Sequence, residues 1–381
     1  MNNKLWRAVS LQIGTIIGAG IFGLPYAIAH AGLPLGVFYL VFLTIISLLV
    51  NLAYAEVILR TPGDHQLTGY SRLYLRRAGT VLGSMALMAG SYGALLAYTA
   101  QMGKFASLLS STLNTDFFFS LAIFSFAVLA VVSGLKRISQ LESLIVPGII
   151  TVVFLVIILG LKEFEFGNIP LGFNDLGAAI TPYGVIFFAL SGTSVIPEVE
   201  EVLRDKRQLM KKAMLLGTLV PAVIYLVFTL VIIGISGAAT SADAVSGLQP
   251  FLPLFIIKIG ALLGLLTMFS SFLTLSYVLK EMFYRDFGLN TSLAWLLSFG
   301  PPLALFLLGT RGFIRILEVS GSLMGGLTGI IIMQLFLQAK KEGQRESPLD
   351  LSLPHWVIVL ICLVFVGGMA YEVIPMIVRL L

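Results

Sequence analysis

The chain alternates between long apolar runs and short polar connections over almost its whole length. A run of about 20 apolar residues is what a bilayer core of roughly 30 Å requires of a helix that crosses it. The pattern therefore predicts an all-α, polytopic membrane protein. Eleven apolar segments can be drawn, at residues 5–30, 33–59, 80–111, 117–132, 144–161, 176–203, 210–235, 251–284, 291–308, 313–337 and 353–377.

Two of these segments carry helix-weakening residues at mid-membrane depth. Gly20 stands five residues before Pro25 in the first segment, and Gly192 stands five residues before Pro197 in the sixth. A glycine inside a helix costs about 1 kcal/mol relative to alanine. Non-helical backbone survives at that depth only where it is buried in protein or lines a cavity. We therefore expect helices 1 and 6 to be discontinuous and to meet at a site halfway through the membrane.

The matched breaks also predict an internal repeat. Segments one to five start from one side of the membrane and segments six to ten from the other, which is a 5+5 inverted repeat. We expect one transmembrane domain over residues 1–381, with a first repeat at 5–161, an inverted second repeat at 176–337 and an additional helix at 353–377. The alternative is that glycine and proline are simply common in membrane helices.

Composition narrows the class of protein. Hydrophobic residues make up 58% of the chain and charged residues 11%, with a mean hydropathy of +0.99, which excludes soluble domains. The net charge of +5 does not indicate nucleic acid, because the basic residues sit in short loops between apolar runs. The single cysteine, Cys362, excludes an internal disulfide and a cysteine-based metal cluster, and no removable signal peptide is expected.

The basic residues predict the orientation. With the N-terminus in the cytoplasm, 18 of the 24 Lys and Arg fall in cytoplasmic loops, as the positive-inside rule requires. An odd number of helices then places the C-terminus outside, in a multi-pass protein of the cytoplasmic membrane. The residues expected in outer loops are Lys162, Arg311, Arg315 and Arg379.

Several motifs are typical of one group of transporters. They are residues 14–22 (Gly-Thr-Ile-Ile-Gly-Ala-Gly-Ile-Phe), Tyr54-Ala55-Glu56 followed by Pro62, and residues 200–205 (Glu-Glu-Val-Leu-Arg-Asp). With these motifs the chain resembles the amino acid-polyamine-organocation superfamily. Residues 23–26 (Gly-Leu-Pro-Tyr) are most like the amino acid/auxin permease branch and the bacterial tyrosine/tryptophan/serine permeases. The resemblance implies the leucine-transporter-type fold, although the loop at residues 64–70 departs from the family pattern.

The first helix break offers main-chain groups for a substrate. The amides of Ala19 and Gly20 start the outer half-helix, where the dipole favours a carboxylate. Around them we expect the carbonyls of Ile17, Phe188, Ala189 and Ser191, and the small positions Gly18, Gly192 and Thr193. Tyr98 is the preferred aromatic neighbour on helix 3 over Tyr92, and Phe188 is placed to close over the ligand. The alternative is that these glycines only allow close helix packing.

A cation site is implied by the same resemblance. Sodium-coupled members pair hydroxyls on helix 8 with carbonyls on helix 1, which here gives Gly14, Ile17, Thr267, Ser270 and Ser271. Bonds from these serines to their own helix are an equal alternative. Some proton-coupled relatives place a lysine from helix 5 at this spot. Segment 144–161 holds no ionisable residue, which favours Na⁺ over H⁺ as the coupling ion.

Acidic residues at membrane depth are candidates for a gate or a proton path. Glu56, Glu198 and Glu201 are the leading cases, and Glu318 is expected to face the outer vestibule near Arg315. For Glu56 and Glu201 the simpler interpretation is a cytoplasmic gate or an interface ion pair with a nearby arginine, rather than a proton path. Glu198, directly after the second break, is open to either role.

The predicted function is secondary active transport of a neutral, and by resemblance aromatic, L-amino acid by cation-coupled symport with alternating access. Proton coupling, exchange, and a non-transporting amino acid sensor of the same fold remain alternatives. A channel is disfavoured because no ring of filter residues is seen. No enzyme, cofactor other than Na⁺ or H⁺, nucleic acid or obligatory partner subunit is expected, since no phosphate-binding Gly-x-x-x-x-Gly-Lys loop or catalytic set occurs.

Overall fold

A computed structural model describes residues 3–110, 115–131, 134–172, 176–310 and 312–378. Arg311 and Arg379, used above for the orientation, lie outside this part. Every regular element in the described part is helical. The α-helices are α1 (Asn3–Ile16), α2 (Gly20–Ala31), α3 (Leu33–Arg60), α4 (Leu67–Ser110), α5 (Asp116–Val131), α6 (Gly134–Gly160), α7 (Leu176–Ala189), α8 (Ile196–Leu203), α9 (Met210–Ser236), α10 (Leu254–Glu281), α11 (Thr291–Leu307), α12 (Phe313–Val319), α13 (Gly326–Glu342) and α14 (His355–Val378).

Eight stretches of the described chain are long and apolar enough to cross a membrane, and the bent pair α1 and α2 makes a ninth. Two further apolar helices, α5 and α11, are shorter, at 16 and 17 residues. Each of the eleven predicted segments therefore coincides with a helix or a broken helix. The prediction of an all-α membrane bundle is confirmed.

Both predicted discontinuities are present. The axis bends by 48° between α1 and α2, at residues 17–19. α7 ends at Ala189, and α8 resumes at Ile196 after a short 3₁₀ turn. In both places the chain leaves the helix where Gly18 and Gly192 reduce helix stability.

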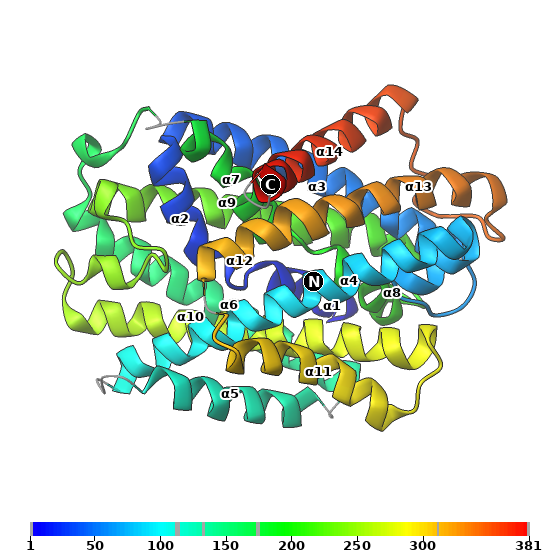
Figure 1. Cartoon of the computed structure of the whole chain (residues 1–381), viewed down its shortest axis with the longest axis horizontal. Coiled ribbons are helices and arrows are strands. Elements are labelled where there is room, and N and C mark those ends of the chain that lie inside the picture. The colour runs from blue at the N-terminus through cyan, green and yellow to red at the C-terminus, as the bar shows by residue number, and fades with distance from the viewer. Residues whose placement is uncertain (1–2, 111–114, 132–133, 173–175, 311, 379–381) are drawn as a thin grey trace.

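The broken helices lie at the centre of the bundle. α1 packs against α6, α8, α9 and α10, while α2 packs against α7 and α9. In Figure 1 most helices run roughly from left to right, with α1 near the middle and α5 and α11 along the lower edge. Residues 17, 19 and 21 are fully buried, so the interrupted backbone is shielded by protein, as its unpaired groups require.

The loops collect at two ends of the bundle. At one end, which we call the basic face, Lys4 pairs with Asp205 at 2.7 Å and Arg204 pairs with Asp64 at 2.6 Å. At the opposite face the amide of Leu33 donates to the carbonyl of Pro170 at 2.8 Å.

Two helices start earlier than the hydropathy pattern predicts. α4 begins at Leu67 rather than at residue 80 and bends at Arg76, which has φ of 57°. α6 begins at Gly134 rather than at residue 144. Its polar first turns are held against α1, because Arg7 donates to Ser139 Oγ at 2.5 Å and the Trp6 indole donates to the Ser143 carbonyl at 3.1 Å. This extension brings Glu142 into the bundle.

Candidate functional site

A cavity lies beside the two helix breaks. It encloses about 980 Å³ of empty space, part of it open to solvent, within the range of small-molecule sites. Tyr98, Phe188, Ser191 and Thr193, all predicted above, contribute to its wall. No Asp, Glu, Lys, Arg or His is among the described residues that line it.

The first break presents main-chain groups next to this cavity. Thr15 and Ile16 line the cavity, whereas Ile17, Gly18, Ala19 and Gly20 are not among its lining residues. The amides at the start of α2 have no partner within their own helix, and the first amide after the turn with a described bond is that of Phe22, to the Ala19 carbonyl at 3.1 Å.

Two glycines at this break are in close contact with other helices. A Cβ on Gly20 would overlap the backbone and side chain of Ala189 on α7. A Cβ on Gly18 would stand 2.7 Å from Ser271 Oγ and 3.0 Å from the Tyr98 hydroxyl. Close packing, the alternative weighed from the sequence, therefore accounts for part of the glycine pattern.

The second break is partly closed by local hydrogen bonds. The Phe188 carbonyl accepts from the Ser191 amide at 3.0 Å, and Ser191 Oγ donates to the Phe187 carbonyl at 2.8 Å. Gly192 is buried against the Ile16 side chain. Of the carbonyls predicted to receive an ammonium group, that of Phe188 is thus already occupied in this conformation.

A tyrosine that sequence reasoning missed joins the two breaks. The fully buried Tyr225 of α9 donates its hydroxyl to the Ile16 carbonyl at 2.5 Å and lies 3.0 Å from the Ala189 carbonyl. A single hydroxyl thus links both interrupted helices. No motif around Tyr225 signals this role, because the contact joins residues more than 200 positions apart in the chain.

Of the predicted cation residues, the structure brings Ser271 and Gly14 together, while Ser270 bonds to an acid. Ser271 Oγ donates to the Gly14 carbonyl at 2.7 Å, and Thr267 donates back to the Gly264 carbonyl at 3.1 Å. Ser270 Oγ donates to Glu142 at 2.6 Å. Ile17, the remaining predicted ligand, is fully buried at the break.

Glu142 corrects one prediction. The expectation that helix 5 holds no ionisable residue is wrong, because α6 includes Glu142 and aims it at Ser270 and Thr274 of α10. The segment was drawn too short, since the flanking Lys136, Arg137 and Glu142 lower its local hydropathy. Because this helix contains Glu142, its composition does not favour Na⁺ over H⁺.

The acidic candidate Glu56 holds a helix end. Its fully buried carboxylate pairs with Arg60 at 2.6 Å and Lys340 at 3.6 Å, and it accepts from Ser347 Oγ at 2.7 Å. It therefore ties α3 to α13 and to the loop that follows, which is the simpler of its two interpretations. Glu318 pairs with Arg315 at 3.0 Å, as the sequence indicates.

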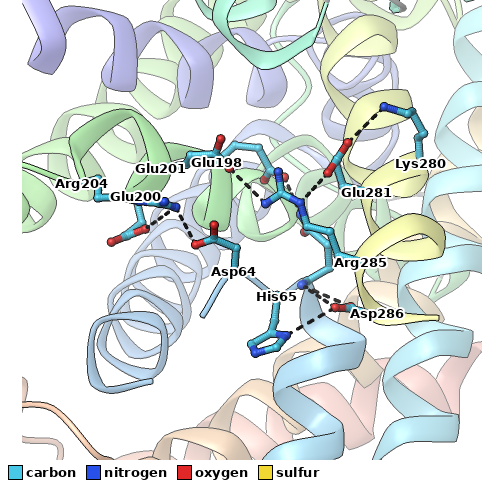
Figure 2. Close-up of polar contacts among 11 residues, drawn as sticks. Asp64, His65, Glu198, Glu200, Glu201, Arg204, Lys280, Glu281, Arg285 and Asp286 are labelled. Atoms are coloured by element: carbon cyan, nitrogen blue, oxygen red, sulfur yellow. Dashed lines mark hydrogen bonds and ion pairs between the residues drawn. The ribbon is translucent and has the colours of Figure 1, made fainter. Parts of the chain in front are cut away.

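Glu198 and Glu201 belong to a cluster of charges near the basic face. Figure 2 shows Arg285 between Glu201 and Glu281, with Asp64 facing Arg204. The Arg285–Glu201 distance is 3.1 Å, whereas the buried Glu198 has no salt-bridge partner among the described residues and accepts from Gln66 Nε2 at 2.5 Å.

The loop before α4 is anchored in the same cluster. Asp286 accepts from the amides of Gln66 and Gly69, the latter at 2.8 Å. Burial, together with Arg72 and Arg285, lowers the pKa of His65 from its ordinary value against the opposing pull of Asp64. Burial also depresses the pKa of Arg204, but Asp64 and its other acidic neighbours raise it above the usual value.

Metal-binding clusters are not found in the part of the chain that the structure describes, where no three His, Cys, Asp or Glu residues are arranged to hold an ion.

Tyr92, the aromatic residue of helix 3 that was not preferred as a substrate neighbour, donates to the Leu297 carbonyl at 2.7 Å and is not among the residues that line the cavity. The charged residues of Figure 2 thus lie near the basic face, while no charged side chain is among the described residues that line the cavity.

Comparisons with known proteins agree with this architecture. The profile of the tryptophan/tyrosine permease family matches residues 1–372. The chain is 22% identical over 364 residues to the tyrosine-specific transport system 1 of Haemophilus influenzae, covering 89% of each protein. It is also 22% identical over 369 residues to glutamine transporter 2 of Aliivibrio fischeri, covering 93% of this chain and 94% of that protein.

Solved structures show the fold. MhsT in complex with L-phenylalanine superposes with a TM-score of 0.76 at 17% identity, covering 95% of this chain and 98% of MhsT. Mhp1 is a nucleobase-cation-symport-1 family transporter, solved in a closed conformation with bromovinylhydantoin bound. It superposes with a TM-score of 0.68 at 13% identity, covering 96% of this chain and 89% of Mhp1. The leucine-transporter-type fold predicted from the sequence is thereby confirmed.

Proposed function

The chain belongs to the tryptophan/tyrosine permease family, and we propose that it is a cation-coupled symporter that carries a neutral, aromatic L-amino acid across the cytoplasmic membrane by alternating access. The observation that carries this proposal is a cavity without charged side chains beside the main-chain groups of two broken helices. A zwitterion needs both an anion and a cation partner, and half-helix ends supply both without a formal charge.

The main-chain groups suit the two ends of an amino acid. The amide end of α2 carries the positive end of a helix dipole and receives the carboxylate. The carbonyls at the end of α7, including that of Ala189, receive the ammonium group. The carbonyls of Phe188 and Ala189 accept other groups in this conformation, so substrate binding exchanges those bonds for bonds to the ammonium.

The cavity wall supports an uncharged side chain. Ile16, Tyr98, Phe187 and Phe188 line it together with Leu190. Aromatic rings bind another ring through stacked or edge-on contacts, whereas a cationic or acidic side chain would find no opposite charge among the lining residues. The named relatives, a tyrosine carrier and a glutamine carrier, both handle large neutral side chains.

The charged cluster of Figure 2 supports a gate on the cytoplasmic side. With the basic face in the cytoplasm, the Glu201–Arg285 pair joins α8 to the π-helical turn Met282–Asp286 that follows α10. The Asp64–Arg204 pair joins the loop after α3 to the end of α8. These contacts must separate for release towards the cytoplasm. We therefore assign these ion pairs to the inward step of the cycle.

Purified protein in proteoliposomes tests the function. We expect uptake of labelled aromatic amino acids under an imposed cation gradient, and no uptake of lysine or glutamate. Phe188→Ala should weaken the apparent affinity at least tenfold, because it removes a ring from the cavity wall. The matched control is Phe118→Ala, whose ring is 71% exposed on α5.

Two results would contradict the proposal. Binding of an amino acid without any flux, in either driven or exchange mode, would favour the sensor alternative. Equal effects of the Phe188 and Phe118 substitutions would mean that the substrate binds elsewhere.

A further inference from the structure

One face of α3 presents polar side chains to the substrate cavity that the proposed function leaves without a role. Ser47, Asn51 and Tyr54 all line the cavity. At about 100° per residue, they lie within about 60° of one another around the helix axis and cover about 10 Å of its length. We call these three residues the α3 stripe. They are buried, since Ser47 is 4% exposed, Tyr54 1% and Asn51 0%.

Each residue of the α3 stripe has a buried polar atom without a hydrogen-bond partner among the described residues. These atoms are Ser47 Oγ, Asn51 Oδ1 and the Tyr54 hydroxyl. The other half of the Asn51 amide is held in place, because Nδ2 donates to Thr218 Oγ1 of α9 at 3.0 Å. Thr218 Oγ1 also accepts from Gln12 Nε2 at 3.4 Å. The Asn51 side chain is therefore fixed through its donor, and its oxygen is left as an open acceptor.

Other hydroxyls near the α3 stripe are already bonded within their own helices. Thr15 and Ser191, which also line the cavity, each donate to the carbonyl four residues earlier at 2.8 Å. Thr44, about one turn before the stripe on α3, is not a lining residue and donates to the Leu40 carbonyl at 2.6 Å. The unpaired hydroxyls of the stripe thus differ from their neighbours, and they lie on the face of α3 that borders the cavity.

Asn51 Oδ1 decides the chemistry of the group that can bind against the α3 stripe. An amide oxygen only accepts hydrogen bonds, so the group that satisfies it must donate one. Tyr98 and Phe188 contribute rings to the same cavity wall. In the proposed function these rings contact the substrate side chain, while the charged ends of the substrate lie at the two helix breaks. The donor therefore belongs to the far end of the substrate side chain.

We propose that the α3 stripe selects substrates whose side chain ends in a hydrogen-bond donor, with Asn51 Oδ1 as the acceptor. The inference rests on the proposed function and narrows its substrate class. A phenol hydroxyl, an indole N–H or a carboxamide fits, and a phenol can also accept from the hydroxyls of Ser47 and Tyr54. A phenyl or alkyl side chain displaces water from these atoms without replacing its hydrogen bonds, which lowers its affinity.

Two ligands that differ by one hydroxyl, L-tyrosine and L-phenylalanine, test the α3 stripe in binding to the purified full-length protein. The wild type should bind tyrosine about tenfold more tightly or better, because phenylalanine leaves buried polar atoms unpaired. Asn51→Leu keeps the approximate size of the side chain and removes the acceptor. It should bring the two affinities within about twofold of each other by weakening tyrosine and leaving phenylalanine near its wild-type affinity.

Two further variants complete the test. Ser47→Ala removes a single oxygen from the α3 stripe and should reduce the preference for tyrosine by about threefold, so the result does not depend on the folding of Asn51→Leu. The matched control is Thr44→Val, which deletes a buried hydroxyl of the same helix that does not line the cavity. It should keep the wild-type preference.

The opposite results are equally clear. Equal affinity of the wild type for the two ligands, or an Asn51→Leu protein that keeps the preference, overturns the proposal. An equal loss of both affinities in Asn51→Leu also overturns it, because Asn51 would then act only through its bond to Thr218. Binding of no amino acid at all defeats the proposed function itself, whereas binding without preference defeats the α3 stripe alone.

Discussion

Among the described residues, Tyr225 is the one side chain that bonds to both helix breaks, and replacing it with phenylalanine removes these bonds. The hydroxyl is fully buried, 2.5 Å from the Ile16 carbonyl and 3.0 Å from the Ala189 carbonyl. Phenylalanine keeps the ring and its packing. The change therefore isolates the hydrogen bond between α9 and the centre of the bundle.

The size of the effect follows from what the Ala189 carbonyl loses, because the Ile16 carbonyl still accepts from the Gly18 amide at 2.9 Å. A buried acceptor left without its partner costs about 1–3 kcal/mol. In a conformation where the breaks separate, water reaches these carbonyls, so the cost applies to the closed arrangement alone. The equilibrium constant for separation of the two breaks should therefore increase by a factor of about 5 to 150, with RT of about 0.59 kcal/mol.

Thiol labelling measures this opening. Ser194 lines the cavity, so Ser194→Cys in a Cys362→Ser background reports access by a water-soluble reagent. The labelling rate should increase by the same factor when Tyr225→Phe is added. Tyr92→Phe is the matched control, because it also deletes a tyrosine-to-carbonyl bond, to Leu297 at 2.7 Å, away from the breaks. Equal rates in the two variants would falsify the idea that Tyr225 holds the breaks together.

Three further predictions concern other parts of the fold. Gly20→Ala should weaken substrate binding at least tenfold and lower the melting temperature, because the new Cβ would overlap Ala189. The matched control Gly148→Ala should change neither quantity, since no atom lies within 4 Å of its new methyl group. Glu56→Gln should leave Arg60 without its buried partner at 2.6 Å and speed hydrogen exchange in residues 343–353; unchanged exchange would refute that anchoring role. The pKa of His65 is lowered in the fold, so the unfolded chain binds more protons below about pH 6.5. Stability should fall as the pH drops through that range, and less in His65→Gln, as thermal unfolding at pH 7.5 and 5.5 will show.

The sequence pattern predicted most of the architecture because membrane helices obey local rules. Apolar runs located the helices, and the glycines before Pro25 and Pro197 located the discontinuities. Local rules also placed Glu56 beside Arg60 one turn away. These features depend on neighbours in the chain, which the sequence displays directly.

The site depends on contacts between distant residues, and there the sequence was less informative. Glu142 was missed because a polar helix start resembles a loop when judged by hydropathy alone. Tyr225 looked like any other aromatic residue, since its partners lie on α1 and α7. The substrate and cation residues named from the resemblance remain predictions, although the structure brings Gly14 and Ser271 into contact.

The short helix α11 has a consequence for the surrounding lipid. It packs against α4 and α10, and its Phe306 stacks on Phe117 of α5 at 5.7 Å between ring centres. At 17 residues and about 1.5 Å per residue, α11 is about 26 Å long, which is less than the roughly 30 Å of an average hydrocarbon core. Local thinning of the bilayer along this flank accommodates such a span, so acyl chains of moderate length should suit the protein best, and lengthening them in a reconstituted membrane should strain this side of the bundle first.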